Sequence, residues 1–311
     1  MTSSQHGGSA APEPGRSAIG GRTPVYGVFG HPVGHSLSPA MQNAALAHLG
    51  LDGIYVAFDV PPDALGDAVR AIRALGLAGV NCTIPHKEAV IPLLDELTED
   101  AARIGAVNTI ENRSGLLVGH NTDAGGFLAA LRAEGLDPGG LRSVVLGAGG
   151  SARAVAAGLA MVGGEVALAN RTVERSQALA EELNRKLGRQ AIRAVPDLPG
   201  ALRAELAGAD LLVNTTPVGM GREGEMRSPA PGEALHAGLF VYDLIYNPLE
   251  TRLLREARAC GARAAGGAGM LAHQGALALE IWTGAAAPVD LMRRVILERL
   301  ALAGGARAPG T

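Results

Sequence analysis

A lysine and an aspartate each follow an apolar run and could exchange a proton. Lys87 ends the segment TIPHK, which closes the apolar run Leu77–Ile84, and Asp123 ends GHNTD after a second apolar run. Functional side chains of open α/β sheets gather where the strands end. An ammonium beside a carboxylate suits general acid–base catalysis. A solvated lysine near a helix start explains the position of Lys87 equally well, so position alone leaves both interpretations open.

The stretch Ser143–Ala157, SVVLGAGGSARAVAA, is typical of a dinucleotide-binding turn. A short β-branched run leads to Gly147, Gly149 and Ala152 at the spacing G-x-G-x-x-A, and alanine-rich helical sequence follows. Such a turn lets the backbone approach a pyrophosphate, and free N–H groups at the helix N-terminus face its charge. Glycine triplets also arise by chance in a chain with 44 glycines, so the interpretation needs further support.

The next predicted strand bears on which dinucleotide would bind. Asn170, Arg171 and Thr172 follow the run Glu165–Ala169, where a fold selective for NAD places an acidic residue on the ribose hydroxyls. A guanidinium suits a 2′-phosphate and a carboxylate repels one, so the sequence favours NADP. The alternative is a solvated arginine after a strand. Asn214–Pro217, which includes Thr215, follows another strand and is also expected to face the cofactor.

Two serines precede a predicted helix and could hold an anionic group. Ser36 and Ser38 flank Leu37 immediately before the helical sequence Ala40–Leu49. Hydroxyls beside a helix N-terminus can bind an anion, although a simple N-cap serine explains the same pattern.

Three further polar residues are expected beside Asp123 or in a cleft. Asn108 and Thr122 are predicted to cluster with Asp123. The alternative, that these polar residues only form a turn, would fit an Asp-Gly or Asn-Gly pair better than it fits this set. Gln274 lies in a helix that should return to the first domain, and we expect its side chain to point into the cleft between domains. A polar position on a helix surface is the alternative.

Three apolar runs predict a first domain of alternating strands and helices. We expect strands over Val25–Gly30, Ile54–Val60 and Leu77–Ile84. Helices are expected at Ala40–Leu49 and Asp63–Leu75, so the sheet should be largely parallel.

The segment after Lys87 is expected to be mostly helical and then to form a hairpin. The helical stretch is Glu88–Arg103, with Pro92 near its beginning. The runs Ala106–Ile110 and Leu116–Val118 should pair around a turn that ends at Gly115.

A second series of short apolar runs, alternating with helical sequence, predicts a doubly wound sheet. A helix that begins near Ala268 and runs through Trp282 should then pack on the first domain. The expected strands are Ser143–Leu146, Glu165–Ala169, Ala191–Val195, Leu211–Val213, Leu239–Leu244 and Arg263–Ala265.

Length and composition indicate a soluble globular protein of about two domains. The chain has 311 residues, of which 47% are hydrophobic and 18% charged, and a net charge of −3 that predicts neither nucleic acid nor membrane as a partner. Two cysteines without a CxxC pair predict neither a disulfide framework nor a metal site. Residues 1–22 and 304–311 are expected to be disordered tails, and no signal peptide is recognised, which favours a cytoplasmic location.

Nine separated segments together resemble the shikimate dehydrogenase family, and the resemblance extends from about Pro24 to Leu302. Each segment is a weak signal alone, but all nine occur in the family's order. They are SLSP (36–39), NCTIPHK (81–87), AVNT (106–109), NTD (121–123), GAGGSARA (147–154), NRT (170–172), NTTPVGM (214–220), YDLIYNP (242–248) and GMLAHQG (269–275).

This resemblance implies an α/β fold of two domains and a role for each matching residue. The substrate-binding catalytic domain would be 23–123 plus 269–303, with a mainly parallel sheet and returning C-terminal helices, and 124–268 would be a Rossmann domain for NADP(H). Lys87 and Asp123 match the catalytic pair. The implied substrate residues are Ser36, Ser38 and Tyr246 at the carboxylate and Thr83, Asn108 and Gln274 at the ring hydroxyls. The implied cofactor residues are Gly147, Ala148, Gly149, Gly150, Ser151, Ala152, Asn170, Arg171, Thr172, Thr215 and Met270.

The implied reaction is reversible hydride transfer between NADPH and 3-dehydroshikimate, giving shikimate for aromatic amino acid (chorismate) biosynthesis. The protein would act as a monomer or homodimer. A quinate/shikimate or aminoshikimate dehydrogenase remains an alternative, although Arg171 argues against members that prefer NAD. A methylenetetrahydrofolate dehydrogenase would not explain SLSP with GMLAHQG. A non-catalytic NADP-binding regulatory protein should have lost part of the pair Lys87 and Asp123.

Overall fold

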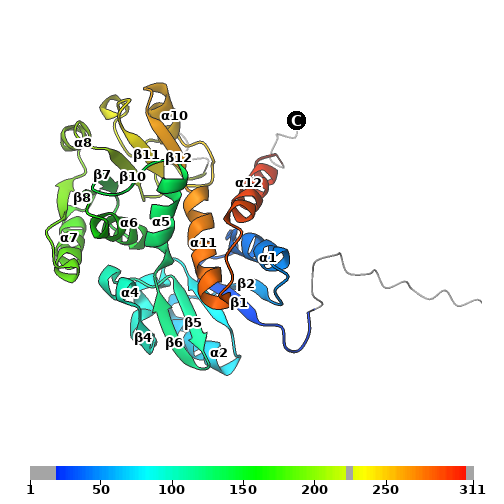
Figure 1. Cartoon of the computed structure of the whole chain (residues 1–311). Coiled ribbons are helices and arrows are strands. Elements are labelled where there is room, and N and C mark those ends of the chain that lie inside the picture. The colour runs from blue at the N-terminus through cyan, green and yellow to red at the C-terminus, as the bar shows by residue number, and fades with distance from the viewer. Residues whose placement is uncertain (1–18, 222–226, 306–311) are drawn as a thin grey trace, which may run out of the picture.

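The computed structural model describes residues 19–221 and 227–305, and for 303–305 it describes the backbone alone (Figure 1). The tails predicted at 1–22 and 304–311 therefore lie outside the described residues, except at 19–22 and 304–305.

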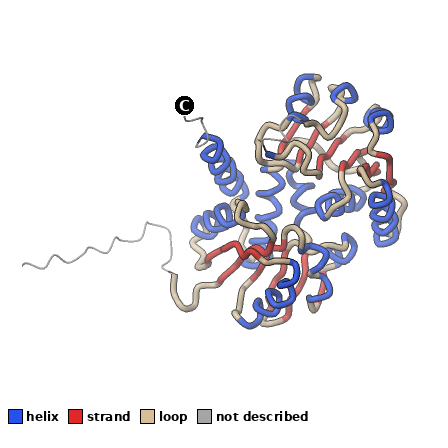
Figure 2. The backbone as a smooth tube through the Cα atoms, turned by 180° about the vertical axis from the view of Figure 1, so that it is seen from behind, coloured by secondary structure: helices blue, strands red, loops and turns tan. Residues whose placement is uncertain are grey.

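Two six-stranded sheets, connected by long helices, form the framework of the described chain (Figures 1 and 2). The first sheet has the order β2-β1-β3-β5-β6-β4. Its strands are β1 Val25–Gly30, β2 Ile54–Asp59, β3 Gly79–Cys82, β4 Glu96–Leu97, β5 Thr109–Arg113 and β6 Leu116–His120.

The first sheet is parallel on one side and mixed on the other. β1 pairs in parallel with β2 and β3, as the β-α-β rhythm predicts. β5 is antiparallel to both β3 and β6, because β5 and β6 form the predicted hairpin. Its turn is Ser114-Gly115, and both residues have positive φ (55° and 99°), which is the conformation that two-residue hairpin turns require.

The second sheet is parallel throughout, in the order β12-β11-β10-β7-β8-β9. All six predicted strands are present within about one or two residues of their expected bounds. They are β7 Arg142–Leu146, β8 Glu165–Asn170, β9 Ile192–Pro196, β10 Leu211–Asn214, β11 Phe240–Asp243 and β12 Arg263–Gly266. Strand order reverses beside β7, so the carboxyl end of β7 lies at the point where doubly wound sheets bind ligands.

Helices cover the sheets and connect them. Those of the first half are α1 Ser38–His48, α2 Leu65–Ala74, α3 His86–Ala89, α4 Glu99–Ile104 and α5 Thr122–Ala133. Those of the second half are α6 Gly150–Met161, α7 Val173–Leu187, α8 Pro199–Leu206, α10 Arg252–Ala259, α11 Ala268–Thr283 and α12 Val289–Gly305.

The segment Glu88–Arg103, expected to be mostly helical, is helical at both ends and interrupted between them. The segment contains the end of α3, a 3₁₀ turn at Ile91–Leu93, the short strand β4 and then α4. Pro92 has no N–H to donate within a helix. Thr98 begins a new helix instead, because its side chain accepts a hydrogen bond from the N–H of Ala101 at 3.4 Å.

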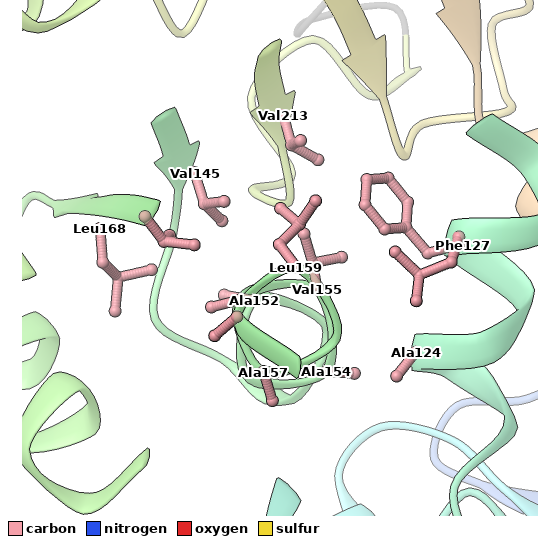
Figure 3. Packing of buried hydrophobic residues seen from close by; sticks show 14 of the residues in the cluster. Ala124, Phe127, Val145, Ala152, Ala154, Val155, Ala157, Leu159, Leu168 and Val213 are labelled. Carbon is pink, nitrogen blue, oxygen red and sulfur yellow. The ribbon is translucent and has the colours of Figure 1, made fainter. Parts of the chain in front are cut away.

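Buried alanines let α6 lie close to the second sheet and to α5. Figure 3 shows Val155 and Leu159 of α6 between the strands that carry Val145 and Val213 and the α5 residue Phe127. These side chains are at most 1% exposed, so the helix contributes a nearly all-apolar face to the core.

The predicted return of α11 to the first sheet is confirmed. Ala272, Ala276 and Leu279 pack with Tyr26 and Val28 of β1 in one buried cluster. The indole N–H of Trp282 donates to the carbonyl of Ile110 at 3.0 Å. A helix that follows the last strand of the second sheet is thereby fixed to the first.

α5 and α11 cross with almost no space between their backbones. A Cβ added at Gly126 of α5 would lie 2.6 Å from the backbone N of Gln274. A glycine at position 126 therefore permits this approach, and the approach sets the separation between Asp123 on α5 and Gln274 on α11.

Candidate functional site

Lys87 and Asp123 form the predicted ion pair. Nζ of Lys87 lies 2.6 Å from Oδ2 of Asp123, and the side chains are 14% and 6% exposed. Lys87 lies on the four-residue helix α3, and Asp123 lies in the first turn of α5, where the Asn121 side chain accepts from the N–H of Ala124 at 3.2 Å. The two groups thus come from elements that are fixed independently.

Asn108 holds the other oxygen of this carboxylate. Its Nδ2 donates to Oδ1 of Asp123 at 3.0 Å and to Oγ1 of Thr122 at 2.9 Å, while its Oδ1 accepts from the N–H of Thr122 at 2.7 Å. Oε1 of Gln274 lies 3.4 Å from the same Nδ2. The predicted cluster of Asn108, Thr122 and Asp123 is therefore present, and it leaves the carboxylate little freedom to rotate.

A cavity of about 200 Å³ brings the predicted substrate residues together. Hydroxyl and amide groups surround the ion pair, so the cavity can bind a small molecule rich in hydrogen-bonding groups. It is lined by Ser36, Ser38, Thr83, Lys87, Asn108, Asp123, Ser151, Tyr246, Met270 and Gln274, among others.

The two serines do not act as a simple helix cap. α1 begins at Ser38, its N-cap position is Leu37, and no side chain makes a cap hydrogen bond there. The backbone N–H of Ser38 instead donates to Oγ of Ser36 at 3.3 Å. Both serines line the cavity, so the N-cap alternative does not account for them.

Tyr246 lines the cavity from the segment after β11, which is held by hydrogen bonds to the buried carboxylate of Asp243. Asp243, at the end of β11, is fully buried and accepts from the N–H of Ile245 at 3.1 Å and from Oγ1 of Thr251 at 2.7 Å. Burial raises the pKa of Asp243, and these hydrogen bonds oppose the rise. Burial also raises the pKa of Tyr246, which keeps its phenol as a hydrogen-bond donor.

A second cavity, of about 250 Å³, joins Lys87 to the glycine-rich turn. Gly149, Gly150, Ser151 and Thr215 line it from the second sheet's side. Lys87 and Ser151 line both this cavity and the first one. The ion pair therefore lies between the two cavities. A ligand bound at the glycine-rich turn and a ligand bound by the predicted substrate residues would meet there.

The turn before α6 has the backbone that its glycines predict. Gly147 has φ +115°, and a Cβ there would lie 2.5 Å from Oγ1 of Thr215, which donates to the carbonyl of Leu146 at 2.6 Å. Gly149 is the N-cap residue of α6 and makes no side-chain cap. Ala148 and Ala152 line none of the three cavities described here, because both pack against the core.

Met270 lies at the start of α11, where its backbone N–H donates to the phenol oxygen of Tyr242 at 3.0 Å. Tyr242 is fully buried in the second sheet, and burial raises its pKa. This contact fixes the cleft end of α11 against the second sheet.

A third cavity, of about 330 Å³, contains Asn170 and Arg171. Nδ2 of Asn170 donates to the carbonyl of Thr172 at 2.8 Å, and Thr172 serves as the N-cap residue of α7 without lining this cavity. Arg227 and Asp197 line it as well. Burial raises the pKa of Asp197, and the charge of Arg171 opposes that rise.

Sequence reasoning missed Arg227, Asp197 and Asp243. Asp197 follows β9 directly and Asp243 ends β11, so the rule that functional groups gather at strand ends could have found both. Arg227 lies in an irregular segment and carries no comparable signal.

Two other kinds of site are not found in the described part of the chain. Residues 19–221 and 227–305 contain no group of three or more His, Cys, Asp or Glu arranged to hold a metal ion. The helices within those ranges are all too short or too polar to cross a bilayer. Cys82 is buried and Cys260 half-buried, and both are free thiols.

Two family models match this chain. Residues 28–110 match the shikimate dehydrogenase substrate binding domain, and residues 267–297 match the shikimate 5'-dehydrogenase C-terminal domain. Both matches include residues that line the first cavity.

Similar proteins cover nearly the whole chain. A shikimate dehydrogenase (NADP(+)) of Methanopyrus kandleri is 53% identical over 285 residues, which are 91% of this chain and 98% of the relative. A crystal structure of a shikimate dehydrogenase in complex with NADP+ has a TM-score of 0.87 at 42% identity, covering 93% of this chain and 99% of that one. A shikimate 5-dehydrogenase of Thermus thermophilus, in complex with NADP(H) and shikimate, has a TM-score of 0.80 at 45% identity, covering 88% and 99%.

Proposed function

Because this chain belongs to the shikimate dehydrogenase family, we propose that it interconverts 3-dehydroshikimate and shikimate by NADP(H)-dependent hydride transfer. The observation that carries the proposal is that Lys87 and Ser151 border both the cavity of the substrate residues and the cavity of the glycine-rich turn. A carbonyl carbon held between these cavities would be within reach of the acid–base pair and of the cofactor at once.

The residues of this chain fit NADP(H). Gly147 and Gly149 leave the backbone open before α6, where a pyrophosphate would accept hydrogen bonds from N–H groups. Arg171 lines the cavity beside the end of β8, where the 2′-phosphate of NADP would lie. Asn170, Thr172, Thr215 and Met270 are assigned to the same cofactor, with Met270 on the nicotinamide side.

The acid–base work is assigned to Lys87. The cofactor supplies the hydride to C3 of the substrate, and the carbonyl oxygen must gain a proton as its C=O bond becomes C–O–H. In reduction Nζ of Lys87 gives that proton, and in oxidation it takes the proton from the substrate hydroxyl. Asp123 holds the ammonium at 2.6 Å and is itself fixed by Asn108.

Two groups of cavity residues are assigned to the substrate. Ser36, Ser38 and Tyr246 line the cavity with hydroxyl groups and are assigned to the substrate carboxylate. Thr83, Asn108 and Gln274 are assigned to the ring hydroxyls near the ion pair.

We also propose the division of the chain into 23–123 plus 269–303 for substrate and 124–268 for NADP(H). The two proposed parts are each centred on one of the two sheets. We propose that the chain acts as a cytoplasmic monomer or homodimer. Its net charge of −3 offers no broad attraction for nucleic acid or an anionic membrane, so neither is proposed as a partner.

The test is nicotinamide absorbance after mixing the purified chain with shikimate and NADP+, with NAD+ and quinate in parallel reactions. Fast reduction with shikimate and NADP+ alone is the expected result. Quinate turnover with NAD+ would instead identify a quinate/shikimate dehydrogenase. No turnover in any reaction, with NADP(H) still bound, would identify a non-catalytic binding protein and refute the proposal.

A further inference from the structure

Arg153 is a buried cation to which the proposed reaction gives no role. It lies in the first turn of α6, and its side chain is 10% exposed. Burying a guanidinium is unfavourable unless acceptors surround its N–H groups. Three acceptors do so here: the carbonyl of Ile104, the carboxylate of Glu88 and the carboxylate of Glu182.

Two of the three acceptors belong to the half of the chain that carries Lys87: Glu88 lies on α3 and Ile104 on α4. The carbonyl of Ile104 ends α4 and accepts from Nη1 at 3.2 Å, and Oε2 of Glu88 accepts from Nη2 at 3.2 Å. Oε2 of Glu182, from α7 beside the second sheet, accepts from the same Nη2 at 2.9 Å. Arg153 therefore connects the two halves of the molecule through contacts that do not involve α11.

The junction is built to admit this side chain. The last carbonyls of a helix have no partner within it and attract positive charge, and Arg153 supplies both a donor and a charge to the end of α4. Gly105, which follows Ile104, has φ +74°. A Cβ there would lie 2.9 Å from Nη1 of Arg153 and 2.5 Å from Nζ of Lys186, so a glycine at 105 leaves the guanidinium its place.

Glu88 is the residue immediately after Lys87, on the same four-residue helix. The inner side of that helix is already fixed: the His86 ring contacts the carbonyl of Val60 at 2.7 Å, and the carbonyl of Lys87 accepts from the N–H of Val107 at 2.8 Å. Glu88 and Arg153 connect its outer side to α6. The stem of Lys87 also lies against the start of α6, since a Cβ at Gly150 would be 3.6 Å from its Cδ.

We propose that Arg153 is a positioning residue, which through Glu88 sets the distance between the helix of Lys87 and the glycine-rich turn that begins α6. This inference rests on the proposed function, because the distance matters only if hydride and proton reach one carbonyl group together. A displacement of about 1 Å from the reactive geometry can lower a rate by about 10²-fold. Partial loosening of this contact is expected to lower the rate by about tenfold.

Glu182 offers a matched control. It gives the same guanidinium a carboxylate, but it belongs to α7 and not to the helix of Lys87. The hydrogen bond from Arg153 is the main cause that lowers the pKa of Glu182 to about 2. Replacing either glutamate leaves Arg153 with one carboxylate, so both variants keep the buried charge partly compensated.

The experiment compares Glu88→Gln with Glu182→Gln in the full chain. The rate of hydride transfer is measured in a single turnover by nicotinamide absorbance, and the dissociation constant of NADP+ by calorimetry. Glu88 is 55% exposed at its side chain, so Glu88→Gln should fold normally. Because Glu88 also lines the cavity of the glycine-rich turn, its loss can change the NADP+ dissociation constant, and the single turnover is therefore measured with NADP+ and shikimate at saturation. At saturation we expect this variant to transfer hydride about tenfold more slowly, and Glu182→Gln to stay within about twofold of wild type.

Each other outcome overturns the coupling. Wild-type rates in Glu88→Gln mean that the contact does not position Lys87. Equal slowing in both variants means that Arg153 contributes stability alone. If the wild-type chain itself fails to oxidise shikimate with NADP+, the proposed function falls and the coupling falls with it, which is distinguishable from a change confined to Glu88→Gln.

Discussion

At the scale of single residues, the two oxygens of the Asp123 carboxylate contact two different partners. Oδ2 contacts the ammonium of Lys87 at 2.6 Å, and Oδ1 accepts from Asn108 at 3.0 Å. An arginine at position 87 could form the same ion pair, but a guanidinium is not deprotonated in proteins. A comparison of lysine with arginine at position 87 therefore tests whether the site needs only a positive charge there or also a proton that can be transferred.

We expect both Lys87→Arg and Lys87→Ala to lower kcat by about 10²- to 10⁴-fold while the KM of shikimate changes far less. Lys87→Arg keeps a cation beside Asp123 yet cannot exchange the proton. The measurement is steady-state turnover of shikimate with NADP+. A kcat near the wild-type value in Lys87→Arg would show that this amine does not transfer the proton.

Arg171→Asp should raise the KM of NADP+. The KM of NAD+ should stay the same or decrease. The guanidinium lies in the cavity assigned to the 2′-phosphate, and Asp197 already contributes one carboxyl group there. A second carboxylate would repel the phosphate. Arg185→Asp, on an exposed position of α7, is the control for the change in net charge. Unchanged discrimination between the two cofactors would remove Arg171 from cofactor selection.

Several polar residues that line the cavities are predictable from the sequence, and the reason is local. Lys87, Asp123 and Arg171 each follow a strand or begin a helix, and short-range patterns mark those places. The partners of Arg153 are not predictable in this way. Glu88 and Glu182 lie 65 and 29 residues away in the chain, and each is an ordinary charged residue in helical sequence.

At the scale of elements, the crossing of α5 and α11 determines the geometry of the site. Asp123 is in the first turn of α5, and Gln274 lies on α11 opposite Gly126. Both helices begin beside the first cavity, so a small change in their separation displaces the Asp123 carboxylate relative to the Gln274 amide.

Gly126→Ala is expected to destabilise the protein by about 1–3 kcal/mol and to lower kcat, because its Cβ would meet the backbone of Gln274 at 2.6 Å. Gly125→Ala is the matched control. Its Cβ would approach the flexible end of Leu277 at 3.1 Å, and the position is exposed, so the better helix propensity of alanine should offset the contact. Urea unfolding and shikimate turnover measure both effects. Equal stability of the two variants would contradict the importance of this crossing.

Helices and strands are predictable from the sequence where a single hydrophobic pattern marks them. The parallel strands of the second sheet have apolar runs bounded by glycine or polar residues, and all six were found. The prediction of a mostly helical segment over Glu88–Arg103 missed β4, because β4 is only two residues long and pairs with β6, which lies about 20 residues later. Such a pairing is a tertiary effect that the local sequence does not encode.

At the scale of the whole molecule, charged contacts as well as helices connect the two sheets. The group around Arg153 contains Glu88 from α3 and Glu182 from α7, with Lys186 at 3.0 Å from Glu182. Protonation of the Glu182 carboxylate removes part of this connection. The stability of the assembled molecule should therefore depend on pH in the acid range.

The pKa of Glu182 is lowered from its ordinary value of 4.5 to about 2 in the folded chain, first by the hydrogen bond from Arg153. The unfolded chain therefore binds the extra proton first as the pH falls. The stabilisation should be complete above pH 4.5 and disappear as the pH falls from there through about 2.

The measurement is the free energy of unfolding of wild type and Glu182→Gln across that range of pH. The difference between them should shrink toward low pH. Glu181→Gln, on an exposed position of the same helix, is the control and should parallel wild type. A constant difference between wild type and Glu182→Gln would show that Glu182 does not contribute through its charge.

The contact between α5 and α11 also restricts how this chain can diverge in evolution. A side chain at Gly126 collides with backbone, so descendants that keep the crossing inherit a nearly invariant spacing between Asp123 and Gln274. Ser36 and Tyr246 come from connecting segments, which tolerate change more readily. New substrates should therefore arise by altering the part of the cavity that Ser36 and Tyr246 form, while the part that Asp123 and Gln274 form is retained.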